Sequence, residues 1–279
     1  MTKTKIEWAD STWNPVSGCQ HGCPYCYARE MARRFGTGWQ ECSKNEIHEL
    51  DKPMKGFHAK NKKVVTEPYP YDFAPTLHAY RLDQPQKWVT PRTIFVCSMA
   101  DLFGDWIPDG WLDEVFTAAE KADRHRHLFL TKNPKRYTDY GVPIDENKWY
   151  GTTITSDTDA DRFNQLPAFA NTFVSAEPLL GDFAGKHNVM FRQIDWIIIG
   201  AESGRRKDKI TPEKEWIENI TREADKHGVP VFMKDSLIKC GTLTEEEMRR
   251  EFPWEVRTLM SPAKEAGQPG DLPTLMSGT

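Results

Sequence analysis

The sequence lacks any long apolar run, and it carries no excess of positive charge. No window holds the roughly 18 apolar residues that a membrane-spanning helix needs, and the opening MTKTKIEWADS lacks the apolar core of a signal peptide. Lysine and arginine number 37 against 41 aspartate and glutamate, a formal net charge of −4. This balance excludes a global electrostatic drive toward nucleic acid, so any polyanion must meet a local patch. We expect a cytoplasmic protein with no membrane partner.

Cysteine is also scarce, with six in 279 residues. In a reducing cytosol a disulfide framework is not expected, so clustered cysteines indicate metal ligands or redox groups. Half of the cysteines are clustered, at Cys19, Cys23 and Cys26. Cys97 lies inside an apolar run and is expected in the core. Cys42 and Cys240 are scattered and are left out of the predicted site.

Short apolar runs rich in β-branched and aromatic residues predict strands. They are KIEW (5–8), TIFVCS (93–98), RHLFLT (126–131), WYGTTIT (149–155), TFVSAEP (172–178), IDWIIIG (194–200) and VPVFMKD (229–235). Several are too uniformly apolar to alternate faces, which is typical of parallel strands covered on both sides. Helical segments separate them, so the sequence predicts an α/β fold, a partial or near-complete (β/α) barrel of about six to eight parallel strands.

The barrel is predicted to span residues 1–241, with a long polar insertion at 36–92 after the first helix. We expect at most one further strand or helix in that insertion. A C-terminal helix is predicted at 242–260, where Thr244 and Glu247 form a capping box, and a disordered tail at 261–279.

Two other predicted helices have clear boundaries or faces. In YAREMARRF the apolar residues Tyr27, Met31 and Phe35 fall on one face, at i, i+4 and i+8. In TPEKEWIENITREADKHG, Thr211 is the predicted N-cap and Gly228 ends the helix.

The cysteine cluster has the spacing C-x-x-x-C-x-x-C, which can wrap three thiolates around one inorganic centre. A structural zinc site usually takes four protein ligands in two separated pairs, and the sequence has no second pair. His21 lies between the cysteines and is badly placed to complete a tetrahedron with its own neighbours. A four-iron cluster held by three cysteines leaves one iron open for a ligand that is also the reactant. Structural zinc and unrelated buried thiols stay open as alternatives.

With Tyr25 at the aromatic position, the motif Cys-x-x-x-Cys-x-aromatic-Cys resembles the signature of the radical S-adenosylmethionine (SAM) superfamily. It follows the first predicted strand and precedes the first predicted helix, as in that superfamily. The wider sequence is similar to a phage-associated family with the motif TWNP-x-x-GC-x-x-x-C-x-x-C, within or beside the superfamily. The segments that carry this similarity, between residues 5 and 236, are TWNPVSGC, GCPYCYA, SMADLFGDWIP, LTKNPKRY, SAEPLLG and GAESG. The superfamily's glycine-glycine-glutamate turn is absent, and SMADLFG stands in a comparable place.

The resemblance implies a radical-SAM-type barrel, a [4Fe-4S] cluster on the three cysteines, and SAM bound to the open iron. It implies that an electron, from a donor such as flavodoxin or ferredoxin, cleaves SAM to a 5′-deoxyadenosyl radical that takes a hydrogen atom from a substrate. The substrate itself is not implied.

Polar residues follow one predicted strand after another, at the ends where function collects in a barrel. Burying so many polar groups would cost roughly 1–3 kcal/mol for each unpaired one, so they predict a cavity wall. The predicted catalytic residues are Glu177, Glu202 and Lys234. The predicted SAM-binding residues are Tyr25, Ser98, Asp101, Thr131, Lys132, Thr153, Glu177, Glu202 and Ser203.

Each of these assignments has an alternative in which the residue has a purely structural role. Either glutamate can be neutralised by a barrel lysine such as Lys132 or Lys234. Asp101 can be the N-cap of a short helix. Lys132 or Arg205 can meet the methionyl carboxylate or lie at a solvated surface.

A nucleotide or nucleic acid is the favoured substrate class. The stretch KPMKGFHAKNKK, residues 52–63, interleaves five lysines with Phe57 and His58, which suits phosphate contact and base stacking. A solvated loop is the alternative. The leading hypothesis is thus a radical SAM enzyme, and the analogy with the phage-associated family favours nucleic-acid modification or repair. Its rivals are a zinc-stapled nucleic-acid-binding module and a barrel hydrolase or lyase that uses the strand-end glutamates.

Overall fold

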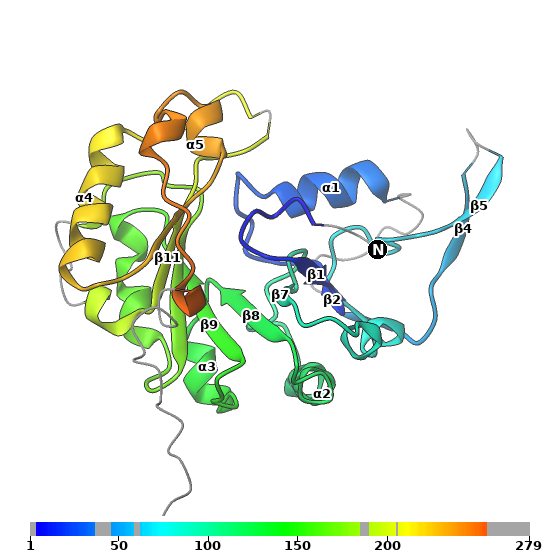
Figure 1. Ribbon diagram of the computed structural model, residues 1–279. Helices are drawn as coiled ribbons and strands as arrows, with labels where there is room; N and C mark the ends of the chain where they lie inside the picture. Colours follow the sequence, from blue (N-terminus) through cyan, green and yellow to red (C-terminus); the bar gives the residue numbers. More distant parts are fainter. Residues whose placement is uncertain (1–3, 37–45, 59–61, 185–189, 205, 256–279) are drawn as a thin grey trace, which may run out of the picture.

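The main sheet of the protein is a curled half-barrel of seven parallel strands (Figure 1). The computed structural model describes residues 4–36, 46–58, 62–184, 190–204 and 206–255. In spatial order the strands are β1 (Ser11–Trp13), β7 (Thr93–Val96), β8 (Arg126–Thr131), β9 (Lys148–Thr153), β10 (Asn171–Ala176), β11 (Trp196–Ile199) and β12 (Val231–Met233). Within the described ranges, no helix is both long and apolar enough to cross a membrane. The predicted α/β fold with a partial barrel is confirmed.

Helices and 3₁₀ segments connect the strands, as right-handed parallel crossovers require. The α-helices are α1 (Tyr27–Phe35), α2 (Asp109–Glu120), α3 (Lys135–Tyr140), α4 (Lys214–Lys226) and α5 (Ser236–Lys239). The 3₁₀ helices are η1 (Ala79–Arg81), η2 (Pro85–Lys87), η3 (Asp157–Gln165), η5 (Met190–Gln193) and η6 (Glu245–Glu247). Figure 1 shows α2, α3 and α4 along the outer side of the curl and α1 at its upper rim.

The first predicted strand is misplaced, because residues 5–8 form no strand and β1 lies further along the chain. Glu7 instead reaches the far edge of the sheet. Its Oε2 accepts hydrogen bonds from the backbone N–H of Asp235 (2.8 Å) and from Nη1 of Arg250 (2.7 Å). This segment therefore spans the opening between β1 and β12, and its polar contacts replace strand pairing.

The inner side of the half-barrel is filled by aromatic and aliphatic side chains. They are Trp8, Phe95, Leu128, Trp149, Phe173, Trp196, Ile198 and Phe232, with Phe252 and Trp254 packed against them. The Trp8 and Phe95 rings lie 4.7 Å apart, centroid to centroid. These side chains pack densely, and they form a floor beneath the carboxyl ends of the strands.

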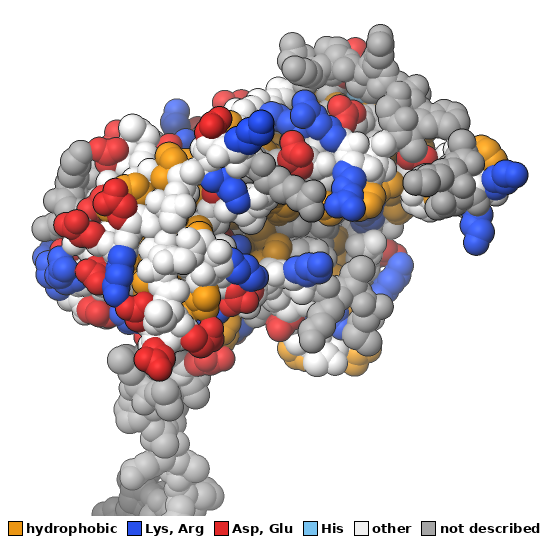
Figure 2. Space-filling view, turned by 90° about the horizontal axis from the view of Figure 1, so that it is seen from above, with side chains coloured by type: hydrophobic (Ala, Val, Ile, Leu, Met, Phe, Trp, Pro, Cys, Tyr) orange, Lys and Arg blue, Asp and Glu red, His pale blue; other side chains and the backbone are white. Residues whose placement is uncertain are grey.

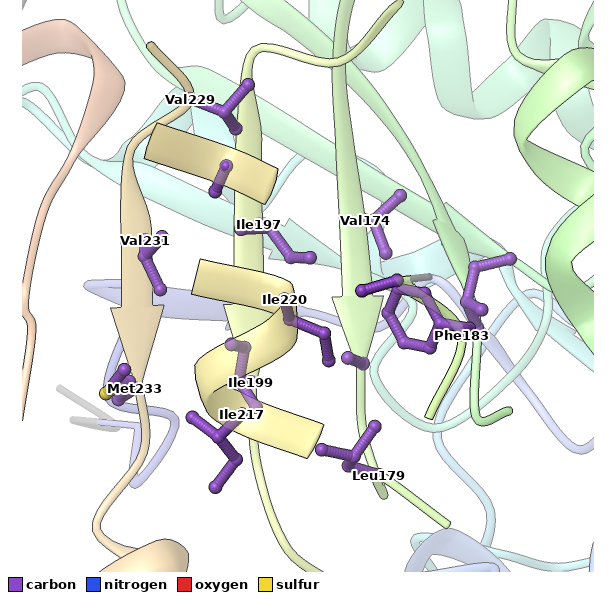
Figure 3. Close-up of a cluster of buried hydrophobic side chains, with 14 of the residues drawn as sticks. Val174, Leu179, Phe183, Ile197, Ile199, Ile217, Ile220, Val229, Val231 and Met233 are labelled. Atoms are coloured by element: carbon purple, nitrogen blue, oxygen red, sulfur yellow. The ribbon is translucent and has the colours of Figure 1, made fainter. Parts of the chain in front are cut away.

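The outer side of the sheet is covered by α4 (Figure 3). Ile217 and Ile220 of α4 face the side chains of β10, β11 and β12, and all of them are almost fully buried. The uniformly apolar strands are thus covered on both faces, as their sequences predicted. The helix ends before Gly228, whose φ of 64° confirms that prediction, but it begins at Lys214 with Glu213 as N-cap, not with Thr211.

The predicted apolar face of α1 is not its buried face. Ala28 and Ala32 are buried, whereas Tyr27, Met31 and Phe35 are 48%, 40% and 49% exposed. Small side chains allow the helix to lie close to the chain beneath it. Met31 and Phe35 are left at the surface, whereas the hydroxyl of Tyr27 donates to the carbonyl of Ser98 (2.6 Å).

The insertion holds more structure than predicted. It contributes β3 (His48–Leu50), β4 (Lys55–His58), β5 (Lys63–Thr66) and β6 (Thr76–His78), besides η1 and η2. The strand β2 (Val16–Ser17) joins β6 and β3 in a three-stranded sheet, and β4 and β5 pair as a hairpin that projects from the body (Figure 1). These strands are only three or four residues long, and β5 (KVVT) is mostly exposed, so no alternation of apolar and polar residues could be recognised in them.

The continuous helix predicted at 242–260 is wrong, because the described part holds only the 3₁₀ turn η6 and a short helical stretch at 253–255. The capping box is confirmed, because Oε2 of Glu247 accepts from the backbone N–H (2.8 Å) and Oγ1 (3.0 Å) of Thr244. Beyond this turn the chain extends, and Arg250 forms an antiparallel bridge with Phe232. Residues 256–260 and the predicted tail at 261–279 lie outside the described residues.

Buried histidines make the fold sensitive to acid. His78 is 0% and His127 1% exposed. Burial, with a smaller effect of nearby positive charge, lowers the pKa of each from 6.5 to about 3. Such a histidine takes up its proton on unfolding, so its stabilising effect is complete above pH 6.5 and is lost as the pH falls toward 3. We expect a shift from about pH 7 to pH 5 to lower the free energy of unfolding by about 2 kcal/mol per histidine.

Urea unfolding at both pH values tests this expectation. The variant His127→Gln cannot take up that proton, so its loss between the two pH values should be about 2 kcal/mol smaller than that of the unaltered protein. Because each protein is compared with itself, any effect of the substitution at neutral pH cancels. Equal losses in the two proteins would contradict the prediction.

Candidate functional site

A cavity of about 410 Å³ lies at the carboxyl ends of the strands, above the aromatic floor. Every residue predicted for the site lines it. These residues are Cys19, Cys23, Tyr25, Cys26, Ser98, Asp101, Thr131, Lys132, Thr153, Glu177, Glu202, Ser203 and Lys234. The strand ends and the cysteine loop, which are far apart in the sequence, therefore share one enclosure, as barrel geometry dictates.

The cysteine loop, residues 18–26, joins β2 to α1 and is fixed at its start by backbone contacts. The N–H of Gly18 donates to the carbonyl of Met99 (2.9 Å), and the N–H of Cys19 donates to the carbonyl of Phe73 (3.2 Å). Gly18 has a φ of 88°, and a Cβ on it would lie 2.2 Å from the carbonyl oxygen of Ala74. Only glycine fits such a close approach, so the loop is pinned against the insertion.

The three thiols are partly buried along this loop. Cys26 is the N-cap of α1, and its Sγ accepts a hydrogen bond from the N–H of Arg29 (3.4 Å). Burial, and next the charge of Asp101, raises the pKa of the Cys19 thiol to about 12. Among the described residues, no three histidine, cysteine or acidic side chains are arranged around one point to hold a single metal ion.

Asp101 ties the cysteine loop to the end of β8. Its Oδ2 lies 2.7 Å from Nε2 of His21 and accepts the N–H of Lys132 (2.9 Å). Its Oδ1 accepts from Oγ1 of Thr131 (2.7 Å) and the N–H of Phe103 (3.0 Å). Burial alone would raise the pKa of Asp101, but His21 and the other donors lower it below its usual value. No helix begins at Asp101, so the N-cap alternative is not realised, and its oxygens are already engaged within the protein.

Glu177 and Lys234 form an ion pair in the cavity wall. Nζ of Lys234 lies 2.6 Å from Oε1 of Glu177, and Oγ of Ser175 donates to Oε2 (3.1 Å). Burial opposes the charge on Lys234, but the adjacent carboxylate prevails and raises its pKa. The alternative in which a barrel lysine neutralises Glu177 is thus the arrangement present.

Glu202 is neutralised by an arginine that the sequence analysis did not single out. Arg206 donates through Nε to Oε1 (2.8 Å) and through Nη2 to Oε2 (2.7 Å). The carboxylate is 1% exposed and the guanidinium 31%, so the pair holds Glu202 at the cavity margin. Arg205, the predicted alternative cation, lies outside the described residues.

Lys132, like Lys5, is a cation of this wall without a described carboxylate at ion-pair distance. Its ammonium lies 5.8 Å from the centre of the Tyr25 ring. Burial, and next the thiol of Cys23, raises the pKa of Tyr25, so this phenol stays neutral. A cation that stands over a neutral ring and faces a cavity is available to an anionic group of a ligand.

The remaining lining residues were not among the predicted catalytic, SAM-binding or metal-binding residues, although Ser175 was expected in the polar wall and Trp8 on the cavity side. They are Lys5, Ile6, Trp8, His21, Tyr27, Ala28, Phe73, Phe95, Ala100, Leu130, Ser175, Pro178 and Ala201. The position of His21 between two cysteines was a usable signal for it, whereas the apolar ones come from the barrel interior and show no local signal. Cys97 is 3% exposed in the core, as predicted, Cys240 is away from the cavity, and Cys42 lies outside the described residues.

Comparison with known proteins gives a family but no activity. No curated protein and no solved structure matches the chain. One family model matches residues 3–255, and its description is "Protein of unknown function (DUF5131)". Because this match covers most of the 279 residues, the chain belongs to the DUF5131 family.

Proposed function

We propose that the protein is a radical SAM enzyme whose cysteine loop holds a [4Fe-4S] cluster beside a SAM-binding cavity. The observation that carries the proposal is the cavity itself. It brings the three cysteines and the polar strand ends into one enclosure of about 410 Å³, within the range of ligand pockets. The motif resemblance indicates SAM cleavage at an iron-sulfur cluster, and the cavity is large enough to hold SAM beside the cysteine loop.

The donor set suits a cluster. Three thiols with no described fourth ligand leave one corner of a four-iron centre to an outside group. In such a centre each thiolate binds a different iron, so the sulfurs need not surround one point as they would for zinc. Bound together, a reduced cluster and SAM would supply a 5′-deoxyadenosyl radical for hydrogen abstraction.

The chain's own residues have separate tasks in this proposal. Lys132 is free to bind the methionyl carboxylate, and Tyr25 limits the space beneath it. The carboxylates of Glu177 and Glu202 are placed to accept hydrogen bonds from the ribose hydroxyls and the amino group, and the hydroxyl of Ser203 is placed to donate or accept one. Ser98, Thr131 and Thr153 complete the polar wall, while the aromatic floor keeps bulk water from the reacting atoms. We assign Glu177, Glu202 and Lys234 as the residues that orient the reactants.

Anaerobic reconstitution with iron and sulfide tests the proposal. We expect a brown protein that releases 5′-deoxyadenosine from SAM when given dithionite, or flavodoxin or ferredoxin as a cytoplasmic electron donor. A protein that takes up no cluster, or carries one and ignores SAM, contradicts it. Bound zinc without SAM cleavage would support the zinc-stapled module. Activity that survives Cys19→Ala but is lost in Glu177→Gln would support the hydrolase or lyase.

We also propose that the substrate is a nucleic acid or nucleotide, on account of the hairpin β4–β5. Phe57 pairs with Val64 across the hairpin, and the two are 53% and 65% exposed on the same face. Lysines flank them at 52, 55, 62 and 63, all exposed, and no acidic residue occurs from 52 to 66. Figure 2 shows basic and apolar side chains together at this end of the molecule. A projecting ribbon of this kind suits phosphate contact by lysine and base stacking by phenylalanine.

Substitutions in the hairpin test this assignment. In a fluorescence-anisotropy titration with short single-stranded DNA, Phe57→Ala should weaken binding at least about fivefold, because stacking on an aromatic ring contributes roughly 1–3 kcal/mol per base. Lys55→Ala should reduce the slope of log binding constant against log salt concentration by about one, because one phosphate contact is lost. Phe169→Ala, which removes a phenylalanine that is 98% exposed elsewhere, is the matched control. Equal losses in Phe57→Ala and Phe169→Ala would contradict the assignment.

A further inference from the structure

A second cavity, of about 420 Å³, lies at the opposite ends of the strands from the site described above. It opens where β1, β7 and β8 begin. Its lining residues are Glu7, Trp8, Ala9, Asp10, Pro91, Arg92, Thr93, Arg124, Arg126, Asn147, Phe252, Trp254 and Glu255. We call it the arginine pocket, after Arg92, Arg124 and Arg126.

Strand register brings the arginines together. Arg126 at the start of β8 pairs with Thr93 at the start of β7, and Arg92 directly precedes Thr93. Nη1 of Arg126 donates to Oγ1 of Thr93 (3.1 Å), and Nη1 of Arg92 donates to Oγ of Ser11 (3.0 Å). Arg124 lies two residues before Arg126 in the sequence. Three guanidinium groups therefore border one hollow.

The guanidinium groups are held in place by contacts with rings, hydroxyls and backbone carbonyls, none of which carries a negative charge, although Asp10 acts electrostatically on Arg126. Arg92 stands over the Trp88 ring (4.9 Å to its centre), and Arg126 over the Trp254 ring (3.9 Å). Arg124 donates through Nε to the carbonyl of Trp88 (3.0 Å) and through Nη2 to that of Gln86 (2.7 Å). Rings and carbonyls fix the groups, and most of the five N–H donors of each guanidinium stay available to a ligand.

The acidic residues of the pocket are largely engaged elsewhere. Glu7 is paired with Arg250 at 2.7 Å, and Oδ2 of Asp10 accepts the backbone N–H of Thr93 (2.8 Å). Glu255 stands at the margin. Within the part of the chain that the structure describes, no carboxylate lies at ion-pair distance from any of the three arginines. Like charges this close repel each other, so the arrangement favours an anion that bridges them.

The positive charge of the pocket also lowers the pKa of a neighbouring histidine. His125 is buried next to the pocket, and its Nε2 lies 2.9 Å from the carbonyl of Pro85. Burial is the main cause of its lowered pKa, and the charges of Arg124 and Arg92 lower the pKa further. Two of the three arginines thus act on the same buried ring.

We propose that the arginine pocket binds a phosphate group. Forked guanidinium donors match the oxygens of phosphate two at a time, and a volume near 420 Å³ admits a nucleotide-sized molecule. The phosphate belongs either to a free small molecule or to a nucleic-acid strand. The proposal concerns a face remote from the cysteine loop and does not depend on the radical SAM assignment.

Calorimetric titration of the full chain tests the proposal, with inorganic tripolyphosphate in one arm and a short 5′-phosphorylated oligonucleotide in the other. We expect saturable binding in at least one arm. The double substitution Arg92→Ala/Arg124→Ala should weaken it at least tenfold, and Arg126→Lys, which keeps the charge but loses the fork, should weaken it less. Binding of tripolyphosphate indicates a small-molecule source, and binding of the oligonucleotide alone indicates a strand.

Two controls separate this pocket from other basic surfaces. Arg222→Ala removes an arginine of α4 that bonds Asn219 and does not line the pocket, and it should leave binding unchanged. Cys19→Ala should also leave binding unchanged, because Cys19 lines the other cavity. Absence of binding in both arms, binding that survives the double substitution in a folded protein, or a loss in Cys19→Ala overturns the proposal. If the double variant fails to fold, Arg126→Lys alone decides, with no weakening as the contrary result.

Discussion

Replacing Cys23 with alanine is expected to abolish both cluster uptake and SAM cleavage. With two thiolates left on the loop, a four-iron centre keeps two corners without protein ligands, so it should be lost during gel filtration. We expect the unaltered protein to retain about four irons per chain after anaerobic reconstitution and Cys23→Ala to retain almost none. Iron analysis and chromatography of 5′-deoxyadenosine measure the two effects separately. Cys19→Ala and Cys26→Ala should behave in the same way.

Cys240→Ala is the matched control for the cysteine variants. Cys240 is a partly buried thiol whose Sγ lies 3.3 Å from the carbonyl oxygen of Leu237, and it does not line the cavity. The control should retain iron and cleave SAM at the unaltered rate. A Cys23→Ala protein that kept a full cluster, or a Cys240→Ala protein that lost one, would show that the assigned ligands are wrong.

Replacing Asp101 with alanine is expected to be the most destabilising single change in the site. It deprives four donors of their acceptor at once: two that are buried, on Thr131 and Phe103, and two that are partly buried, on His21 and Lys132. Each buried polar group left unpaired costs roughly 1–3 kcal/mol, and water entering the space recovers part of this, so we expect a loss of about 3–5 kcal/mol. Urea unfolding of the cluster-free protein at neutral pH measures the loss.

Asp105→Ala is the control, because Asp105 is a nearby exposed aspartate that accepts one hydrogen bond from Asn133 (2.7 Å). It should cost less than about 1 kcal/mol, as exposed single hydrogen bonds do. If Asp101 positions the cysteine loop, Asp101→Asn should still fold but take up cluster more slowly than the unaltered protein. Equal stability of the Asp101 and Asp105 variants would refute this role.

Strands and the site wall were predictable because their signals are local. The run IDWIIIG indicates a buried strand wherever it occurs, and parallel strands place the residues that follow them at one edge. Glu177, Glu202 and Lys132 could therefore be assigned to one wall from the sequence. Cysteine spacing is equally local, so the loop could be recognised without any knowledge of the fold.

The partners of these residues were less predictable, because pairing is decided by distant parts of the chain. Arg206 neutralises Glu202 through a loop conformation that no periodicity records. His21 meets Asp101 across 80 residues. The strands of the insertion were missed for a different reason, since three or four residues are too few to show an alternation of apolar and polar side chains. The buried face of α1 was predicted wrongly because Ala28 and Ala32 let the helix lie closer to the rest of the protein than larger side chains would.

The link from Glu7 to the far edge of the sheet has a consequence for synthesis. Its partners lie 228 and 243 residues further along the chain. The opening of the half-barrel can thus be bridged only after Asp235 and Arg250 have left the ribosome, and until then the nascent strands carry an unprotected edge. The segment from Glu7 to Asp10 thus emerges well before its partners and takes its place only after them, which makes translation speed and chaperone access part of this protein's folding problem.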